Sequence, residues 1–282
     1  MSEQSNLRIR GMRPDEIAMA ADWAAAEGWN PGLADADCFA AVSRDGFFIG
    51  ELDGTPVATV SCVNYGASFA FLGLYIVREH VRGRGHGLRM WNAAIAHAGP
   101  RVIGLDGVVA QQQNYRKSGF KLAYANVRYG GRVAPRPAPP AGIMPLADVP
   151  FATVAADDAT AFPAPRSSFL RAWISARGHV GRALVRDGRL AAWGVIRPCR
   201  TGRRIGPLAA DDRAAAEAVF AALVAAGPGE VFLDVPSVNR DAVALAQDHG
   251  LAPVFETARM YTGAIRPVRL ERVFGVTTFE LG

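Results

Sequence analysis

The sequence predicts an α/β (α+β) protein built as two tandem domains that share one pattern of strands and helices. Its 282 residues are many for one core, and 50% of them are hydrophobic and 20% charged, as in folded chains. Residues 130–142 hold four prolines and three glycines, which predicts a stiff, extended connection. Because the pattern restarts beyond it, we place the domains at residues 1–131 and 142–282, joined by a linker at 132–141.

The first domain is predicted from apolar runs and turn residues. Pro14 closes a first strand, and Asp53-Gly54 joins two strands into a hairpin to which the apolar run 69–77 adds a third strand. Gly99-Pro100 ends a helix. In order, strands are expected at 7–13, 47–52, 57–64, 69–77, 102–105 and 121–129, and helices at 15–27, 35–42, 88–98 and 111–118.

The second domain is predicted to be a diverged copy of the first. The step from Gly119 to Arg128 recurs from Gly250 to Arg259, and each follows a Leu-Asp pair, at 105–106 and 233–234. Its helices are expected at 151–159, 167–176, 213–225 and 241–249, and its strands at 181–185, 190–196, 205–208, 231–235 and 254–261.

Composition narrows the class of protein. The net charge of +5 suits a polyanionic small molecule, and no long basic stripe interleaved with aromatics indicates nucleic acid. No apolar run approaches the roughly 18–20 residues of a membrane span, and the polar N-terminus is unlike a signal peptide. Three scattered cysteines indicate neither a disulfide framework nor a metal site. We therefore expect a cytoplasmic protein without a metal, a membrane or nucleic acid as partner.

A glycine-rich loop is the strongest functional signal. It stands between the strand at 69–77 and the helix at 88–98, and reads Arg82-Gly83-Arg84-Gly85-His86-Gly87 before Leu88. Glycines let a ligand approach the backbone closely, and the first turn of a helix offers free N–H groups to an anion. The G-x-G-x-x-G loop is excluded because Met90 stands at its last position, and no G-x-x-x-x-G-K-[ST] is present. The loop therefore predicts a phosphate site of another kind.

With these residues the chain resembles the GNAT superfamily of N-acetyltransferases. The loop fits that family's [RQ]-x-x-G-x-[GA] as Arg82-x-x-Gly85-x-Gly87, and Tyr115, Gly119 and Phe120 fit its Y-x-x-x-G-F. The order of elements agrees over about residues 7–130. The resemblance implies two tandem GNAT-like domains, each a mixed, mostly antiparallel sheet flanked by helices.

The resemblance also implies a cofactor site. The pyrophosphate of acetyl-CoA, the co-substrate, is expected on Arg82, Gly83, Arg84, Gly85, His86, Gly87 and Leu88. The backbone of Leu74, Tyr75 and Ile76 is expected to hold the pantetheine arm and the acyl carbonyl. The side chains of His86 and His97 are interpreted as surface or packing residues, and Cys62 as a core residue.

The activity implied is direct transfer of an acetyl or another short acyl group to the primary amine of a small molecule or a peptide. Tyr115 is the expected proton donor to the leaving thiolate, a core aromatic being its alternative. Asp106 and Glu27 are candidates for the general base. The alternative for Asp106 is a residue of a simple turn, and the alternative for Glu27 is a solvated residue at a helix end. A chain of waters in place of either base also stays open. Succinyl-CoA as donor, a catalytically silent acyl-CoA-binding or sensing module, and an oligomer stay open.

The second domain lacks the chemical residues. Pro207, Asp211 and Asp212 stand where the glycine loop belongs, and they remove an N–H donor and add negative charge. Ala246 replaces the tyrosine. We therefore predict a non-catalytic copy, and CoA binding by the N-terminal half alone.

Overall fold

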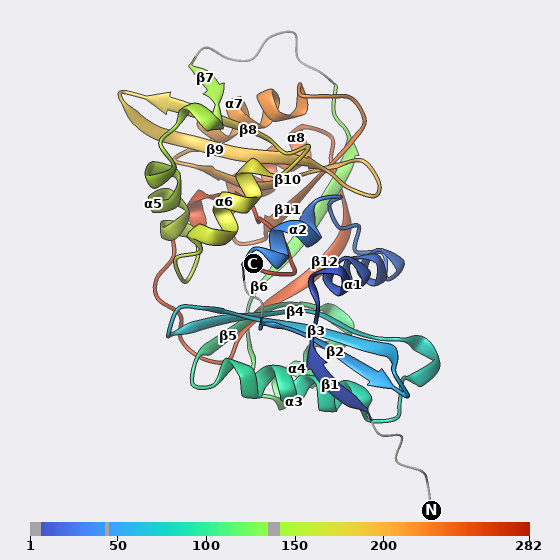
Figure 1. Cartoon of the computed structure of the whole chain (residues 1–282). Helices are drawn as coiled ribbons and strands as arrows, with labels where there is room; N and C mark the ends of the chain where they lie inside the picture. The colour runs from blue at the N-terminus through green and yellow to red at the C-terminus, as the bar shows by residue number, and fades with distance from the viewer. Residues whose placement is uncertain (1–6, 43–44, 135–141) are drawn as a thin grey trace, which may run out of the picture.

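The computed structural model describes residues 7–42, 45–134 and 142–282 (Figure 1). The first half contains β1 (Arg8–Gly11), α1 (Pro14–Ala26), α2 (Asp35–Ala40), β2 (Phe47–Leu52), β3 (Thr55–Tyr65), β4 (Phe69–Val77), α3 (His86–Ala98), β5 (Val102–Val108), α4 (Gln112–Lys117) and β6 (Lys121–Arg132). The second contains β7 (Ile143–Pro145), α5 (Phe151–Ala161), α6 (Ser167–Ser175), β8 (Val180–Arg186), β9 (Arg189–Pro198), β10 (Arg203–Ala210), α7 (Arg213–Val224), β11 (Glu230–Pro236), α8 (Arg240–Asp248), β12 (Ala252–Tyr261) and β13 (Val273–Gly275).

These bounds match the expected elements closely. The strand at 69–77 is found with its predicted limits, and the helix expected at 88–98 begins two residues earlier, at His86. Two short strands, β7 and β13, were not predicted, because three residues carry too little periodicity to be recognised. Of the expected linker, Arg132 is the last residue of β6, and residues 135–141 lie outside the described residues.

The strands described form one sheet of 13, with the order β1-β2-β3-β4-β5-β12-β6-β11-β10-β9-β8-β7 and with β13 paired to β10. Two neighbouring pairs are parallel, β4 with β5 and β10 with β11, and they occupy equivalent places in the two halves. The other pairs are antiparallel. This is the mixed, mostly antiparallel sheet that was expected in each half.

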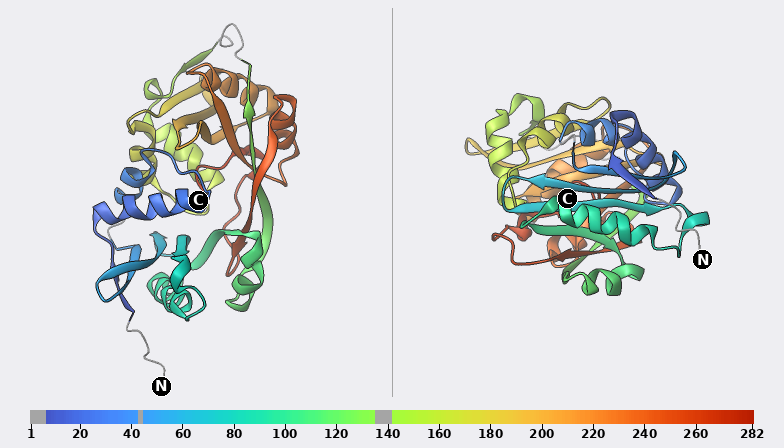
Figure 2. Two further views of the ribbon diagram at one scale, coloured as in Figure 1. Left: turned by 90° about the vertical axis from the view of Figure 1, so that its right-hand side faces the viewer. Right: turned by 60° about the horizontal axis from the view of Figure 1, so that its bottom comes forward.

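The two halves exchange their last strands. β12, from the second half, pairs with β5, and β6, from the first half, pairs with β11, while β6 and β12 also pair with each other. The two long strands run side by side between the halves in the left view of Figure 2. The two expected mixed sheets are therefore continuous with each other, because each half completes its sheet with a strand of the other.

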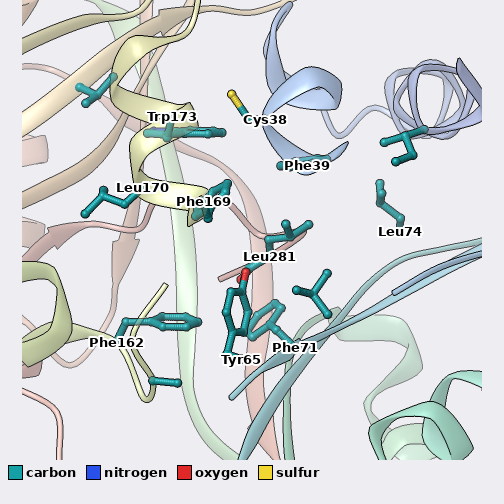
Figure 3. Packing of buried hydrophobic residues seen from close by; sticks show 14 of the residues in the cluster. Cys38, Phe39, Tyr65, Phe71, Leu74, Phe162, Phe169, Leu170, Trp173 and Leu281 are labelled. Atoms are coloured by element: carbon teal, nitrogen blue, oxygen red, sulfur yellow. The ribbon is translucent and has the colours of Figure 1, made fainter. Parts of the chain in front are cut away.

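Some helices cover the outer faces of the sheet, and others lie between the two halves. α3 and α4 lie on the outer side of the first half, and α7 and α8 pack on the second half (Figure 1). Between the halves, α1, α2, α5 and α6 share one hydrophobic core (Figure 3). In this core Phe39 and Phe71 of the first half pack with Phe169, Trp173 and Leu281 of the second. The halves thus fold around common apolar surface. Within the described residues, no helix combines the length and the apolar composition needed to cross a membrane.

Candidate active site

The candidate site is a cavity where β4 and β5 separate. The two strands pair from Phe69 with Val102 to Leu72 with Leu105, and no further. Beyond that point a cavity of about 400 Å³ opens between them. Its walls come from β4, β5, the glycine loop and Tyr115, and also from the loop after α1, from β12 and from the C-terminal segment. Residues of both halves therefore build one cavity.

A bulge in β4 prepares one wall of the cavity. The register with β3 shifts between Ser61, opposite Gly73, and Thr59, opposite Ile76. Leu74 between them has φ 45°, which a leucine rarely adopts, and the Thr59 hydroxyl donates a hydrogen bond of 2.8 Å to its carbonyl. Because β5 has diverged here, the edge of β4 that faces the cavity has no strand partner. An extended chain with amide groups can pair with such an edge. Leu74, Tyr75 and Ile76, which were expected at the acyl-CoA arm, all line this cavity.

The glycine loop lies at one end of the cavity. Gly83 (φ 77°) and Gly85 (φ 82°) take the left-handed backbone that favours glycine, and a β-carbon on Gly87 would lie 2.6 Å from the Tyr75 hydroxyl. Gly85 is the N-cap of α3, and no side chain caps this end of the helix. A helix end without a side-chain cap is a typical place for an anion to bind.

The side chains and glycines of the loop lie in three different surroundings. Arg82, Gly83 and Gly87 line the cavity. Arg84 and Leu88 are exposed beside it, and Arg84 forms no ion pair within the described ranges. His86 is 3% exposed, so its side chain is a packing residue and not a surface one.

Arg82 and Glu27 form an ion pair at the mouth of the cavity. Arg82 Nη2 lies 2.5 Å from Glu27 Oε1, and Arg82 Nε donates to the carbonyl of Val77 at 2.8 Å. Both side chains are partly exposed, at 48% and 37%. The Arg82 guanidinium is therefore held between Glu27 and the end of β4, and Glu27, one of the two expected bases, already has a positive partner.

Tyr115 reaches the cavity from α4. Its ring stacks on Trp91 with 5.5 Å between centroids, and a β-carbon on Gly107 would lie 2.1 Å from its Cε2. Gly107 thus makes room for the ring. Burial, with a smaller contribution from Tyr75, raises the pKa of Tyr115 to about 12, so its hydroxyl keeps its proton at neutral pH.

Asp106 is hydrogen-bonded to side chains of the two exchanged strands, β12 and β6. Arg259 of β12 donates to both of its carboxylate oxygens, at 2.8 Å and 2.6 Å, and Asn126 donates a third hydrogen bond at 2.7 Å. Both oxygens of Asp106 are therefore engaged by partners on the neighbouring strands. Asp106 lines the cavity, but its bonding is that of a structural ion pair.

The sequence analysis missed Glu280. This residue follows the last expected strand, in an otherwise apolar and Thr-rich stretch that ends the chain, and no motif marks it. In the structure it lines the cavity opposite the bulge, where a β-carbon on Gly73 would lie only 2.0 Å from the Glu280 carbonyl oxygen. The absence of a side chain on Gly73 therefore permits the contact. The described residues contain no group of three or more His, Cys, Asp or Glu side chains placed to hold a metal ion.

Both halves match models of one family. A model described as "Acetyltransferase (GNAT) family" matches residues 15–120, and one described as "Acetyltransferase (GNAT) domain" matches residues 154–275. The chain is 32% identical over 285 residues to a holothin acyltransferase of Pseudoalteromonas sp. (strain SANK 73390), covering 100% of this chain and 97% of that protein. The chain belongs to the GNAT acetyltransferase family. The expected tandem of GNAT domains is thereby confirmed.

Solved GNAT structures show the same fold. A putative acetyltransferase from Pyrococcus horikoshii superposes with a TM-score of 0.84 at 24% identity, over 100% of this chain and 98% of that one. A tandem GNAT protein from the clavulanic acid biosynthesis pathway gives a TM-score of 0.63 at 16% identity, over 92% and 99%. The identities are low, so these similarities concern the fold alone.

The second GNAT half has the same strand separation, but it is filled. β10 and β11 pair only from Arg203 to Ile205 and then diverge as β4 and β5 do. There β13 pairs with β10, and Val276 N–H donates to the carbonyl of Asp234 on β11. The C-terminal segment of the chain thus occupies the place that corresponds to the cavity of the first half.

The N-terminus of α7, the helix that follows this filled slot, is also unavailable to an anion. The Asp212 carboxylate caps α7 by accepting from Ala215 N–H at 2.8 Å, and it pairs with Arg186. Asp211 pairs with Arg272. Ala246, at the position of the tyrosine, is fully buried on α8. Of the residues expected in place of the glycine loop, Asp211 and Asp212 lie in the turn before α7, whereas Pro207 lies within β10. The Asp212 side chain occupies the helix N-terminus, where an anion would otherwise bind.

Proposed function

We propose that this chain is an acyl-CoA-dependent N-acyltransferase that moves an acetyl or another short acyl group to the primary amine of a small molecule. The observation that carries the proposal is the cavity between β4 and β5. It joins an uncapped helix N-terminus, an unpaired strand edge and Tyr115 in one continuous space.

In this proposal the donor lies along β4. The pyrophosphate binds the loop N–H groups of residues 83–88, with Arg82 and Arg84 adding positive charge. The amide groups of the pantetheine arm pair with the free edge at Tyr75 and Ile76. The thioester carbonyl then reaches the bulge at Leu74, where backbone N–H groups stabilise the oxygen that becomes negative during attack.

The reaction proposed is direct attack of a neutral amine on the thioester. A carbon–nitrogen bond forms, the carbon–sulfur bond breaks, and the leaving thiolate takes a proton from the Tyr115 hydroxyl. The raised pKa of Tyr115 keeps that proton available over the pH range in which enzymes work. We propose that the second half is non-catalytic, supported by β13 in its slot and Asp212 on its helix.

The acceptor side of the cavity is aromatic. Trp29, Phe255 and Phe279 line it, and the two phenylalanine rings lie 6.4 Å apart with Arg128 against both. Such walls favour a compact, flat amine over a polar peptide. The similarity to a holothin acyltransferase supports holothin as the first acceptor to try.

The test is release of free thiol from acetyl-CoA, propionyl-CoA and succinyl-CoA with a panel of amines that includes holothin and a lysine peptide. Amine-dependent thiol release and a product heavier by the acyl group support the enzyme. Binding of acetyl-CoA in calorimetry, without thiol release for any amine, supports the alternative of a silent acyl-CoA sensor.

A further inference from the structure

Three carboxylates line the cavity, those of Glu27, Asp106 and Glu280, and they differ in their partners. Glu27 is paired with Arg82 at the mouth, and Asp106 is held on both oxygens by Arg259. Glu280 Oε2 accepts a hydrogen bond from the Thr278 hydroxyl, whereas Oε1 accepts none from any residue that the structure describes. Glu280 also forms no ion pair within those residues. It is therefore the lining carboxylate that is best able to accept a proton from a ligand.

The C-terminal segment holds Glu280 in place on both sides. Before it, Arg166 donates to the Thr277 hydroxyl at 2.8 Å; after it, the Tyr65 hydroxyl donates to the Leu281 carbonyl at 3.0 Å. The Thr278 hydroxyl also accepts from Glu280 N–H at 3.0 Å. Residues 274–282 are all buried. This fixed backbone passes against Gly73, next to the bulge, so Glu280 lies beside the position proposed for the thioester carbonyl.

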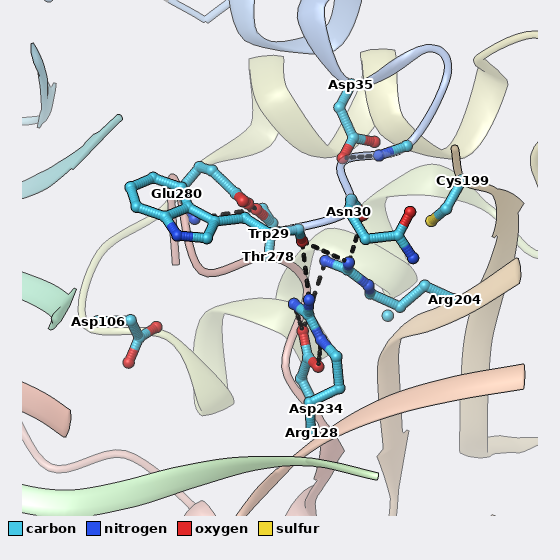
Figure 4. Close-up of polar contacts among 12 residues, drawn as sticks. Trp29, Asn30, Asp35, Asp106, Arg128, Cys199, Arg204, Asp234, Thr278 and Glu280 are labelled. Carbon is cyan, nitrogen blue, oxygen red and sulfur yellow. Dashed lines mark hydrogen bonds and ion pairs between the residues drawn. The ribbon is translucent and has the colours of Figure 1, made fainter. Parts of the chain in front are cut away.

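Several buried charged side chains lie near Glu280. Figure 4 shows Glu280 with its dashed bond to Thr278, near a group of buried arginines and aspartates. Arg128 of β6 and Arg197 of β9 both interact electrostatically with Glu280. The group contains three positive and three negative side chains, all buried: Arg128, Arg197, Arg204, Asp35, Asp234 and Glu280. The buried carboxyl and guanidinium side chains of this group are therefore equal in number, and buried charge without compensation is costly.

We propose that Glu280 is the general base of the acyl transfer, an inference that rests on the proposed function. The acceptor arrives as an ammonium ion, and Glu280 Oε1 takes one proton from it to leave a neutral amine. The nitrogen then attacks the thioester carbon. Its second proton is lost as the carbon–sulfur bond breaks, and the thiolate is protonated by Tyr115, which recovers its proton from the nitrogen. Glu280 returns the first proton to solvent, so the products are the amide, CoA and H⁺.

The segment 273–282 thus has two roles in this proposal. Its first part, β13, fills the slot of the second half, and its later part carries the base into the first half. The non-catalytic half is then needed for the chemistry of the other, because it anchors the segment. Asn239 on the second half does so directly, donating from Nδ2 to the carbonyls of Glu271 and Val273 at 3.0 Å each.

The test compares Glu280→Gln, Glu280→Asp and the wild type with two acceptors. One is an alkylamine, charged at neutral pH, and the other is an aromatic amine of low pKa, already neutral. For the alkylamine, Glu280→Gln should lower kcat by about 10²–10⁴-fold, a typical range for general base catalysis, and remove the acid limb of its pH profile. The loss with the aromatic amine should be much smaller, Glu280→Asp should retain part of the activity, and acetyl-CoA affinity should stay unchanged. Glu271→Gln, at an exposed glutamate two residues before the segment, is the matched control and should behave as wild type.

Two results would overturn the assignment. Full kcat of Glu280→Gln with the alkylamine would show that another group takes the proton. An equal loss with both amines, accompanied by weaker acetyl-CoA binding, would show that Glu280 only supports the fold. A wild type that releases no thiol with any amine would instead overturn the proposed function, and the assignment of Glu280 with it.

Discussion

Arg259 and Asp106 form a two-pronged ion pair across the boundary between the halves. Arg259 Nη2 lies 2.6 Å from Asp106 Oδ2, and the two residues stand opposite each other on β12 and β5. The same relationship occurs between Arg128 on β6 and Asp234 on β11, with Nε 2.6 Å from Oδ1. Each exchanged strand thus brings an arginine to the aspartate of the other half. The repeated Asp and Arg of the sequence pair between copies and not within them.

Loss of one partner of this ion pair should destabilise the whole chain. Asp106→Asn leaves the buried Arg259 guanidinium without its counter-ion, which typically costs about 3–5 kcal/mol. Because the sheet is continuous, both halves should unfold in one transition at a lower urea concentration. Asp248→Asn, which breaks the exposed pair with Arg213, is the control and should change the free energy of unfolding by about 1 kcal/mol or less. A similar small change for Asp106→Asn would contradict the structural role.

Cleavage of the connection between the halves should not separate them. A protease site placed within residues 135–141 and cut in the folded protein should leave two fragments that elute together, since β12 stays between β5 and β6. Thiol release should persist. Residues 1–131 alone should bind acetyl-CoA poorly, because they lack Phe255 and Glu280 from the cavity and leave β5 without its neighbour. This replaces the sequence-based expectation that the first half binds CoA by itself. Separate elution of the fragments after the cut would argue against the exchanged strands.

The glycine loop can be tested with a pair of matched variants. Gly85 and Gly188 both have positive φ, at 82° and 74°, and a β-carbon at either would meet open space. Alanine at either position should therefore cost a similar backbone strain of about 1–2 kcal/mol. Only Gly85→Ala should weaken acetyl-CoA binding in calorimetry, because its methyl group occupies the space where phosphate approaches the backbone. Equal affinities for the two variants would remove the loop from the binding site.

The affinity for acetyl-CoA should fall as salt is added. Arg84 is exposed and Arg82 is positioned at the cavity mouth, so both attract the phosphates through a screened field. Arg84→Gln should weaken binding by about fivefold or less at low salt, as for an exposed ion pair, and flatten the salt dependence. Arg189→Gln, on the hairpin between β8 and β9, is the control. An affinity that is constant from low to high salt would indicate mainly apolar recognition.

Tyr115→Phe should lower kcat by about 10²–10⁴-fold, because the substitution removes the hydroxyl proton that the thiolate would take. The affinity for acetyl-CoA should remain nearly unchanged, because the side chain loses little volume. The pKa of Tyr115 is raised to about 12, so the wild type should show no alkaline loss of rate from this group between about pH 9 and 11. A full rate for Tyr115→Phe, measured with a substrate for which chemistry is slow, would leave the tyrosine with a packing role against Trp91.

Features that depend on neighbouring residues along the chain could be predicted from the amino-acid pattern. Strand and helix periodicity, the Asp53-Gly54 hairpin and the glycine loop are local patterns, and they were sufficient for nearly all elements and for the family. The family resemblance implied that Leu74, Tyr75 and Ile76 hold the acyl-CoA arm, and these residues line the cavity on the strand that precedes the loop.

The strand exchange and the position of Glu280 depend on contacts between residues distant in sequence, and they could be seen only in the folded chain. The repeat of Asp and Arg is the same whether each copy closes its own sheet or borrows a strand, because both arrangements satisfy the same backbone hydrogen bonds. The pairings of β12 with β5 and of β6 with β11 distinguish the two arrangements, and the first of them ties Asp106 to Arg259. Glu280 enters the cavity because the segment before it fills the second half's slot, about 200 residues after the β4 bulge that it faces. Side chains brought together over such separations leave no periodic signal, since packing and charge compensation act through space.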